Sequence, residues 1–448
     1  MSLNKTNTNK ALTIIGGGLA GCEAAWRAAT LGLKVKLWEM KPQKYSPAHS
    51  NPDLAELVCS NSLRAEDSSN AVGLLKEELT LLGSIVMEAA LAHRVSAGRA
   101  LAVDRVAFSR YITEKVESHP NIEVIRQEFR PPLIDQGPLI VACGPLATDE
   151  VTSDLAQITG SDHLNFYDAL APIVEDDSLD KSKLFLADRY GPPEEGDYLN
   201  APFTQNELNL FIAALLEADR ARARPFEEEK YFEGCLPIEV MAQRGVKTLC
   251  FGPMKPVGLI DPKSGRRPAA IVQLRRENAH GSHWNIVGFQ TRLTIPAQEK
   301  VFRLIPGLEK VKFARYGAIH RNTYLVAPKV LDDFQCLVKA PDIFIAGQLS
   351  GVEGYVESAA QGLWAGENAA RRLLGLAMVQ APPETALGSL VGRLTKKVKE
   401  VTFCPSNVNF GLFPPVDPQV PKKDQAAFRL ERARKAWPSF LKDINYAR

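Results

Sequence analysis

The sequence predicts an α/β protein in which a first domain, built from both ends of the chain, is interrupted by an inserted α+β domain. Three observations carry this prediction. A β-rich run, a glycine cluster and an alanine-rich helical pattern open the chain at residues 11–30. A second strand–glycine–helix pattern follows at 342–373, more than 300 residues later. Between them, after residue 160, the sequence changes character and includes a stretch rich in proline and glycine at 186–203.

Composition excludes several classes of protein. The 448 residues are 45% hydrophobic and 24% charged, with a net charge of +2, as in an ordinary globular protein. No run of 18 apolar residues is present, and the polar first ten residues do not resemble a secretory signal. Seven widely spaced cysteines without a CxxC pair argue against a disulfide framework and a structural zinc site. We therefore expect a cytoplasmic protein without a metal site or a membrane contact, in which local basic patches hold any polyanion.

The first element is a β–turn–α–β unit with a dinucleotide fingerprint. The run ALTIIGGG leads into G-x-G-x-x-G, and the following strand KVKLWEM ends in Glu39, 18 residues after the last glycine. In such a unit Gly16 permits the tight turn, Gly18 lets a pyrophosphate approach the backbone, and Gly21 lets helix and strand pack closely. The terminal carboxylate accepts hydrogen bonds from a ribose. The predicted cofactor-binding residues here are Gly16, Gly17, Gly18, Leu19, Ala20, Gly21 and Glu39.

A fingerprint at the start of so long a chain favours FAD over NAD, in a Rossmann-like domain of the glutathione-reductase-like class. The late element at 342–373 supplies the strand, glycine turn and long helix that close such a site, and 139–146 supplies a third buried strand. The helix start near 351–355 can direct backbone N–H groups at flavin or phosphate oxygens. The cofactor-binding residues predicted here are Gly347, Gln348, Gly351, Gly354 and Tyr355.

The remaining patterns predict the elements between these two halves. Residues 45–70 read as a long polar loop, and loops of that length are usually functional. The patterns predict helices over 74–90, 103–119 and 204–222, the last capped by Thr204, a strand over 121–128, and strands joined by turns over 248–278. The predicted domains are 1–160, 161–320 and 321–448, the first and last forming one FAD-binding domain.

Five motifs together resemble one family. Besides the glycine start, they are LVCSNSLR at 57–64, FEGCLPIE at 232–239, FGPMKPVGL at 251–259 and AGQLSGVEGYVESAAQG at 346–362. From about residue 11 to about residue 415, the chain resembles the folate- and FAD-dependent tRNA (uracil-5-)-methyltransferases of the TrmFO family. The related MnmG proteins share the FAD core and an AGQ…GY…AAAQG element, but they are longer and carry a C-terminal helical domain.

The resemblance implies a reaction. The one-carbon unit comes from 5,10-methylenetetrahydrofolate, reduced FAD serves as methylene carrier and reductant, and NAD(P)H recharges the flavin. The acceptor is C5 of the uridine at position 54 in the tRNA T-loop. Two alternatives stay open at this point: an MnmG-like modification of the wobble uridine at position 34, and a non-catalytic, FAD-stabilised tRNA-binding or folding factor.

This reaction needs cysteine chemistry, because C5 of uracil is a poor nucleophile until a thiolate adds to C6. The resemblance points to Cys59 and Cys235 as the catalytic pair. We expect Cys235 to attack C6 and Cys59 to be the thiol that bonds the flavin adduct; the opposite assignment is the alternative. We expect Cys22, Cys143 and Cys250 to be packing residues.

Three residues are predicted to bind substrate. His320 could stack on a pterin, or instead form a structural pair with a carboxylate, and Arg321 could hold an oxyanion or a phosphate. Glu353 could bond the flavin or pterin edge. The target base must leave the folded tRNA to reach the flavin, and basic clusters could hold the phosphates. These clusters are Lys263, Arg266, Arg267, Arg275 and Arg276; Arg220, Arg222 and Arg224; and Arg393, Lys396, Lys397 and Lys399.

Overall fold

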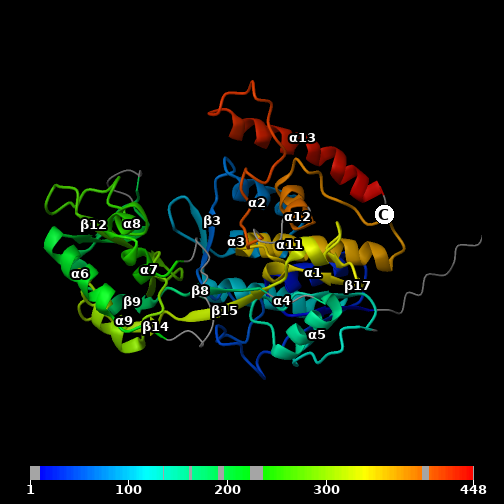
Figure 1. Ribbon diagram of the computed structural model, residues 1–448, viewed down its shortest axis with the longest axis horizontal. Helices are drawn as coiled ribbons and strands as arrows, with labels where there is room; N and C mark the ends of the chain where they lie inside the picture. Colours follow the sequence, from blue (N-terminus) through cyan, green and yellow to red (C-terminus); the bar gives the residue numbers. More distant parts are fainter. Residues whose placement is uncertain are drawn as a thin grey trace, which may run out of the picture.

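The computed structural model describes residues 11–134, 136–160, 164–189, 196–221, 236–395 and 403–446. It confirms the predicted α/β fold, with a Rossmann-like sheet and a second, inserted α+β body. Figure 1 shows the two bodies side by side, the inserted one in green on the left and the first one, from both ends of the chain, on the right.

The first body contains a six-stranded sheet in the order β16-β17-β7-β1-β2-β6. All neighbouring strands pair in parallel except β16 and β17, which are antiparallel. Because β7 and β2 flank β1, the carboxyl ends of three neighbouring strands meet beside the first glycine turn. The strands are β1 (Leu12–Ile15), β2 (Val35–Trp38), β6 (Ile122–Ile125), β7 (Leu139–Val141), β16 (Cys336–Leu337) and β17 (Ala340–Ile345).

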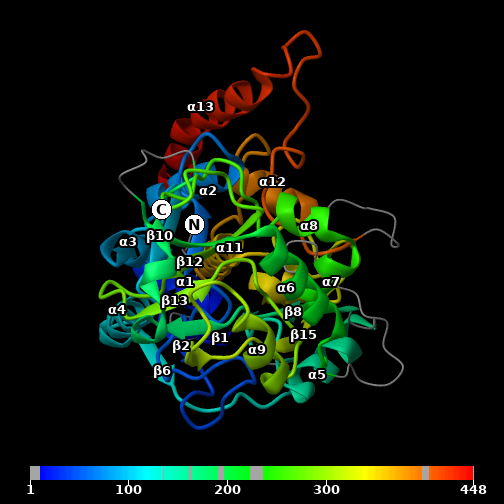
Figure 2. The ribbon, with the colours of Figure 1, turned by 90° about the vertical axis from the view of Figure 1, so that its left-hand side faces the viewer.

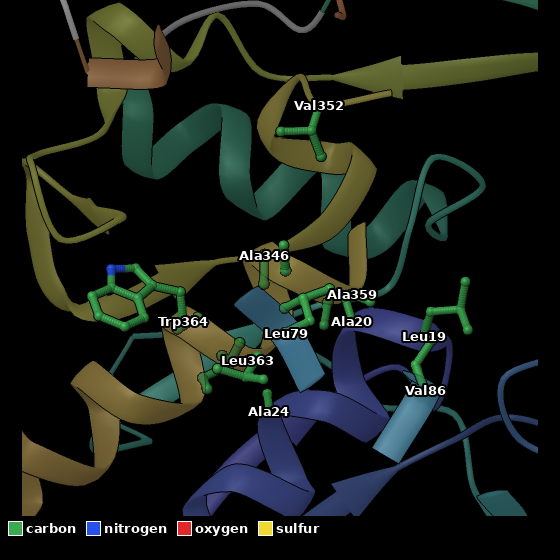
Figure 3. Close-up of a cluster of buried hydrophobic side chains, with 14 of the residues drawn as sticks. Leu19, Ala20, Ala24, Leu79, Val86, Ala346, Val352, Ala359, Leu363 and Trp364 are labelled. Carbon is green, nitrogen blue, oxygen red and sulfur yellow. The ribbon is translucent and has the colours of Figure 1, made fainter. Parts of the chain in front are cut away.

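Two long helices pack against this sheet and against each other. They are α1 (Leu19–Thr30) and α11 (Tyr355–Leu373). A Cβ added at Gly362 would lie 2.0 Å from the carbonyl oxygen of Ala20, and one at Gly366 would lie 2.6 Å from that of Ala24. The two helix backbones therefore touch, and Figure 3 shows Ala20 and Ala24 in the buried cluster with Leu363.

The other helices of this body surround that core. They are α2 (Ala71–Leu81), α3 (Ile85–Ala92), α4 (Arg105–Ser118), α5 (Asp149–Thr159), α10 (Ala327–Val330), α12 (Ala386–Thr395) and α13 (Gln425–Tyr446). A small antiparallel sheet, β3-β5-β4, comprises β3 (Ser62–Ala65), β4 (Arg94–Val95) and β5 (Ala100–Val103). The last helix, α13, lies along the outside of this body in Figures 1 and 2 and buries Trp437, Phe440 and Ile444.

The inserted body is an antiparallel sheet in the order β10-β11-β12-β13-β9-β14. Its strands are β9 (Ile173–Glu175), β10 (Phe185–Leu186), β11 (Tyr198–Phe203), β12 (Ala270–Arg276), β13 (His283–Ile286) and β14 (Phe313–Arg315). Its helices are α6 (Gln205–Glu217), α7 (Ile238–Gln243), α8 (Val246–Phe251) and α9 (Ile295–Phe302). Phe203, Phe211, Phe289 and Phe302 form a chain of ring contacts in its core.

The chain passes between the two bodies through a two-stranded ribbon. β8 (Leu164–Ala169) leads into the inserted body, and β15 (Ile319–Tyr324) leads out. The two strands pair antiparallel, with Ile319 opposite Ala169 and Tyr324 opposite Leu164. This pairing keeps the entry and exit of the inserted body together (Figure 1).

Local structure departs from the sequence expectation in three places. The helix predicted over 74–90 is two helices, because Gly83 adopts a left-handed φ of +76° and the Ser84 hydroxyl caps α3 through the Met87 N–H at 3.0 Å. The loop predicted over 45–70 contains β3, and the segment 248–278 contains the end of α8 and only one long strand, β12. The Thr204 cap is confirmed as a capping box with Glu207.

No helix in the described part of the chain is both long and apolar enough to span a bilayer.

Candidate functional site

A pocket runs along the carboxyl ends of β1, β2 and β7 and over the start of α1. Five parts of the chain line it: the first glycine turn, the end of β2 with the loop after it, the segment after β6, the segment after β7, and the turn and first residues of α11. Among its lining residues are Gly16, Gly17, Gly18, Leu19, Ala20, Glu39, Cys143, Gly144, Gly347, Gln348, Tyr355 and Ser358. This is the place where α/β folds of this topology bind nucleotides.

The three fingerprint glycines differ in what surrounds them. A Cβ on Gly16 would lie 2.6 Å from the Ala142 carbonyl oxygen, and its φ of +101° suits only glycine. A Cβ on Gly21 would lie 1.7 Å from the Gly16 carbonyl oxygen, so this glycine serves close packing. Nothing lies within 4 Å of a Cβ built on Gly18, so the space beside this residue can take a pyrophosphate.

The acid at the end of β2, Glu39, holds the first glycine turn by hydrogen bonds. Glu39 is buried, and its two carboxylate oxygens accept the N–H groups of Gly17 and Lys41, each at 2.9 Å. No side chain in the described part of the chain caps the N-terminus of α1. Backbone N–H groups and the positive end of the helix dipole therefore face the pocket, and the site fits the ribose and pyrophosphate of FAD.

The late element contributes unequally to the pocket. Gly347, Gln348 and Tyr355 line it, whereas Gly351 and Gly354 do not. A Cβ on Gly351 would lie 2.6 Å from the Phe403 ring, and one on Gly354 would lie 2.4 Å from the Glu357 carboxylate. These two glycines shape the turn that leads into α11.

Cys59 lies on a loop whose backbone is held from two sides. The Tyr355 hydroxyl oxygen accepts the N–H of Cys59 at 2.7 Å and that of Ser60 at 3.2 Å. Arg315, at the end of β14, donates to the carbonyl oxygens of Val58 at 2.9 Å and Cys59 at 3.2 Å. Because Tyr355 also lines the cofactor pocket, the Cys59 backbone is tied directly to that pocket.

A second set of bonds fixes the loop on either side of Cys59. Arg275 of β12 donates to the Ser60 hydroxyl at 2.7 Å and the Asn61 side-chain oxygen at 2.9 Å. Arg105 of α4 donates to the Leu57 carbonyl oxygen and pairs with Glu277 at 2.8 Å. The inserted body thus supplies Arg275, Glu277 and Arg315 to a loop of the first body.

Electrostatics around this loop are dominated by burial. Burial, and then the neighbouring Arg105 guanidinium, lower the pKa of Arg315. Burial, and then the Cys59 thiol, raise the pKa of Tyr355 above its usual value. The Tyr355 hydroxyl therefore stays protonated at neutral pH and can donate to a neighbouring acceptor while it holds the loop.

The loop after β2 supplies pocket residues that sequence analysis did not single out. Lys41, Ser46, His49 and Glu56 line the pocket. The buried Lys41 ammonium donates to the Asn51 and Asp53 carbonyl oxygens at 3.0 and 2.6 Å and to Glu56 at 3.2 Å. The only signal in the sequence was the length and polarity of this loop, which predicted function without predicting a residue.

His49 is the titratable group of that loop. Its Nδ1 lies 2.5 Å from the Ser46 hydroxyl. Burial, and then the Lys41 ammonium, lower its pKa below the usual value. The ring is therefore neutral at neutral pH, with Nδ1 held by Ser46.

The predicted substrate-binding residues lie around the same region. His320 is on β15, and burial followed by Arg315 and His49 lowers its pKa. Those neighbours are not carboxylates, so they do not support the alternative of a His–carboxylate pair. The backbone of Arg321 follows in the same strand. Glu353 accepts from the Gln348 side chain at 2.6 Å and so orients a residue that lines the pocket.

The cysteines occupy different environments. Cys235 lies outside the described residues. Cys22 is buried and donates to the Gly17 carbonyl oxygen at 3.3 Å, as packing would require. Cys143 lines the pocket, and burial raises its pKa to about 12, so its thiol is protonated at neutral pH. Cys59 is half-buried on the tethered loop.

The structure separates the predicted basic clusters. Arg275 is buried against the Cys59 loop, whereas Lys263, Arg266 and Arg267 are exposed. Arg220 and Arg393 donate to the carbonyl oxygens of Leu216 and Cys404. The predicted residues that lie outside the described part are Arg222, Arg224, Lys396, Lys397 and Lys399. Among the residues described, no group of three His, Cys, Asp or Glu side chains could hold a metal ion.

Comparison with known proteins agrees with this geometry. Residues 11–377 match the family model described as Glucose inhibited division protein A. The chain is 57% identical over 422 residues to the methylenetetrahydrofolate--tRNA-(uracil-5-)-methyltransferase TrmFO of Geotalea uraniireducens, covering 94% of this chain and 96% of that protein. It is 54% identical over 428 residues to the protein of the same name from Desulfotalea psychrophila, covering 95% of each chain.

Solved structures resemble the fold at lower identity. Aquifex aeolicus GidA in one crystal form superposes with a TM-score of 0.69 at 17% identity, covering 97% of this chain and 73% of that chain. A second crystal form of the same protein gives a TM-score of 0.68. At this identity the likeness shows the fold.

Proposed function

The chain belongs to the GidA family and, within it, to the TrmFO methylenetetrahydrofolate--tRNA-(uracil-5-)-methyltransferases, and from this premise we propose how its residues carry out that reaction. The enzyme uses FAD, takes its one-carbon unit from 5,10-methylenetetrahydrofolate and methylates C5 of a uridine in tRNA. We assign the uridine to position 54 of the T-loop, NAD(P)H as the electron source and the cytoplasm as the location.

The cofactor is held by the residues of the pocket. The N–H groups at the start of α1 and the open space beside Gly18 suit the pyrophosphate, and Glu39 suits the adenosine ribose. Gln348 and Tyr355 approach from the late turn. When bound, FAD supplies the reducing equivalents and carries the one-carbon unit.

The cysteines supply the covalent chemistry. We assign to Cys235 the attack on C6 of the uracil, which forms an S–C6 bond and moves an electron pair to C5. C5 then bonds the methylene carbon and loses its proton, and expulsion of the thiolate breaks the S–C6 bond and restores the ring double bond. The reducing equivalents that FAD would supply convert the methylene into the methyl group as its bond to the carrier breaks. Cys59 is assigned to the flavin side of the reaction.

One observation supports the Cys59 assignment most directly. The Tyr355 side chain lines the cofactor pocket and accepts the Cys59 N–H at 2.7 Å. A cysteine that served only as packing would not need its backbone held by a pocket residue on one side and by Arg315 on the other. These contacts hold the backbone of the loop beside the cofactor pocket, which supports a role for the Cys59 thiol there.

The experiment is a methylation assay with unmodified tRNA, methylenetetrahydrofolate and NAD(P)H, followed by nucleoside analysis. We expect 5-methyluridine at position 54 and none at the wobble position. Labelled S-adenosylmethionine should transfer no label. Modification at position 34 would favour the MnmG-like alternative, and RNA binding without turnover would favour the non-catalytic one.

The assignment of Cys235 gives the first testable prediction. Cys235→Ala should lower kcat by at least about 10³-fold while flavin absorbance and tRNA affinity stay near wild type, because only the C6 nucleophile is removed. Cys59→Ala is the matched variant. A stable complex with 5-fluorouracil-containing tRNA identifies the thiol that bonds the base, and its formation by Cys235→Ala would reverse the two assignments.

A further inference from the structure

The inserted body carries an exposed apolar surface that the cofactor site does not use. Phe251, the last residue of α8, is 79% exposed, and Ile260 and Val257 in the following segment are 57% and 37% exposed. Isolated exposed apolar residues are ordinary. Three within ten residues, on one short segment, indicate a contact surface.

The segment is anchored and is held in a defined shape. Met254 and Leu259, which alternate with the exposed residues, are buried at 0% and 3% exposure. The Met254 N–H donates to the Leu249 carbonyl oxygen at 2.9 Å, and its carbonyl oxygen accepts the Ile271 N–H of β12 at 3.1 Å. The exposed side chains therefore project from a segment attached to both α8 and β12.

A tight turn then presents cations beside the apolar residues. The Asp261 carboxylate accepts the Lys263 N–H at 3.0 Å, and its backbone N–H donates to the Arg266 carbonyl oxygen at 3.0 Å. Lys263, Arg266 and Arg267 are exposed. Residues 246–267 hold five lysines and arginines against one acid. We call this surface the apolar–basic ridge: Phe251, Val257, Ile260, Lys263, Arg266 and Arg267.

Charge decides between the possible occupants. A second copy of the chain in a two-fold interface would set the ridge against itself, and its like charges would oppose each other. A polyanion gains from every cation through counterion release, and an exposed aromatic ring offers a stacking surface for an unpaired base. The mixture of side chains therefore fits RNA better than it fits a protein partner.

The position of the ridge also suits a large substrate. Arg275, near the end of β12, contacts the Cys59 loop, and the ridge precedes the start of that strand at Ala270. Seven residues of strand span roughly 20 Å. A folded RNA whose target base lies at the Cys59 site is large enough to reach the ridge.

We propose that the apolar–basic ridge is a docking surface for the tRNA substrate, with the cations on backbone phosphates and Phe251 stacked on an unpaired base. The proposal rests on the proposed function, because that function identifies tRNA as the substrate. It assigns substrate affinity to this ridge, apart from the cofactor pocket.

The charge component is tested with Arg266→Glu/Arg267→Glu. We expect the affinity for an unmodified tRNA transcript to fall at least tenfold, and the slope of log affinity against log salt to become shallower by about two. Flavin content and NAD(P)H oxidation should not change. The matched control is Lys300→Glu/Arg303→Glu, with the same charge change on α9 and at its C-cap; Figures 1 and 2 place α9 away from α8.

The stacking component is tested with Phe251→Ala. Removing one base–aromatic contact should weaken transcript binding by about tenfold while the salt slope stays at the wild-type value. This combination separates stacking from charge. Leu210→Ala, which truncates another exposed apolar side chain of the inserted body, should bind the transcript like the wild type.

Three outcomes are decisive. If both ridge variants bind the transcript within twofold of their controls, the ridge is not the docking surface. If the wild type is a dimer that Phe251→Ala dissociates without any loss of RNA affinity, the ridge is a contact between copies and the proposal is wrong. A wild type that binds the transcript without methylating it would refute the proposed function, while the binding comparison would still test the ridge.

Discussion

Gly18 and Gly21 belong to the same fingerprint, yet their side-chain positions meet different surroundings. The Cβ position of Gly18 is open, and that of Gly21 is filled by the Gly16 carbonyl oxygen at 1.7 Å. Gly18 therefore leaves space for the ligand, and Gly21 allows close packing of helix and strand. This difference can be tested at single residues.

Gly18→Val should lose FAD while the protein stays folded, because its methyl groups would occupy the place of the pyrophosphate. Gly21→Ala should instead destabilise the fold by about 1–3 kcal/mol or more, since helix and strand must separate. Flavin absorbance and thermal unfolding of the apoproteins measure the two effects. Full flavin occupancy in Gly18→Val would refute the assignment of the pyrophosphate site.

Arg315 is a positioning residue at the same scale. Arg315 donates charge-assisted hydrogen bonds to the Val58 and Cys59 carbonyl oxygens. Without them, the active conformation of the Cys59 loop should be less stable by about 1.5–3 kcal/mol. Arg315→Gln should therefore lower kcat by roughly 10–100-fold. Arg315→Lys should recover part of the loss. The rate of Cys59 alkylation should change in Arg315→Gln, because the loop that carries the thiol is no longer held by the two hydrogen bonds.

The control for Arg315 is Arg303→Gln, an exposed arginine of the same body that pairs with Glu299. It should leave both kcat and Cys59 alkylation unchanged. If Arg315→Gln lowered kcat only in proportion to a loss of folded, flavin-containing protein, the residue would be structural and the positioning role would be wrong.

At the scale of elements, a buried acid joins two helices. Glu78 of α2 is fully buried, and its carboxylate accepts the Ala386 and Leu387 N–H groups at the start of α12, each at 2.8 Å. Burial raises its pKa to about 7, although these hydrogen bonds oppose the shift. The helix contact therefore includes a group that titrates near neutral pH.

The sign of the resulting pH dependence follows from linkage. With a folded pKa near 7 and an ordinary value near 4.5, the folded state binds more protons between these values, so stability falls as pH rises through this window. The full loss is at most about 3.5 kcal/mol. Glu78→Gln should flatten the stability profile between about pH 5 and 7.5, and Glu114→Gln, at an exposed position of α4, should not. Equal slopes in denaturant unfolding would contradict the assignment.

At the scale of the whole molecule, the cofactor pocket joins parts of the chain that are far apart in sequence. Gly18, Gly144 and Gly347 line one pocket. A ligand that binds there stabilises only the assembled molecule. Figure 1 shows how the first and last parts of the chain come together around α1 and α11.

FAD at 100 times its Kd should add about 2.7 kcal/mol to stability and raise the unfolding midpoint by a few degrees. Riboflavin, which lacks the phosphates, should give a smaller shift at the same concentration, because the start of α1 then has no anion to bind. Thermal unfolding of apoprotein with each ligand measures this. Equal shifts would show that the phosphate site contributes no affinity.

The sequence by itself determined the FAD fold, the capped helix α6 and the family, because these depend on local spacing: glycines at fixed offsets, a Thr–Glu capping box and contiguous motifs. The fold class and the resemblance to TrmFO are confirmed. The domain bounds and the roles of the predicted site residues stay predictions.

Only the tertiary structure decided what holds Cys59. Arg315, Tyr355 and Arg105 are far from it in sequence, and no local pattern marks an arginine that will donate to a distant carbonyl oxygen. The structure likewise divided the predicted basic cluster into the buried Arg275 and the exposed cations of the ridge. Residue type and spacing specify local conformation, whereas burial and side-chain partners depend on which distant segments the folded chain brings together.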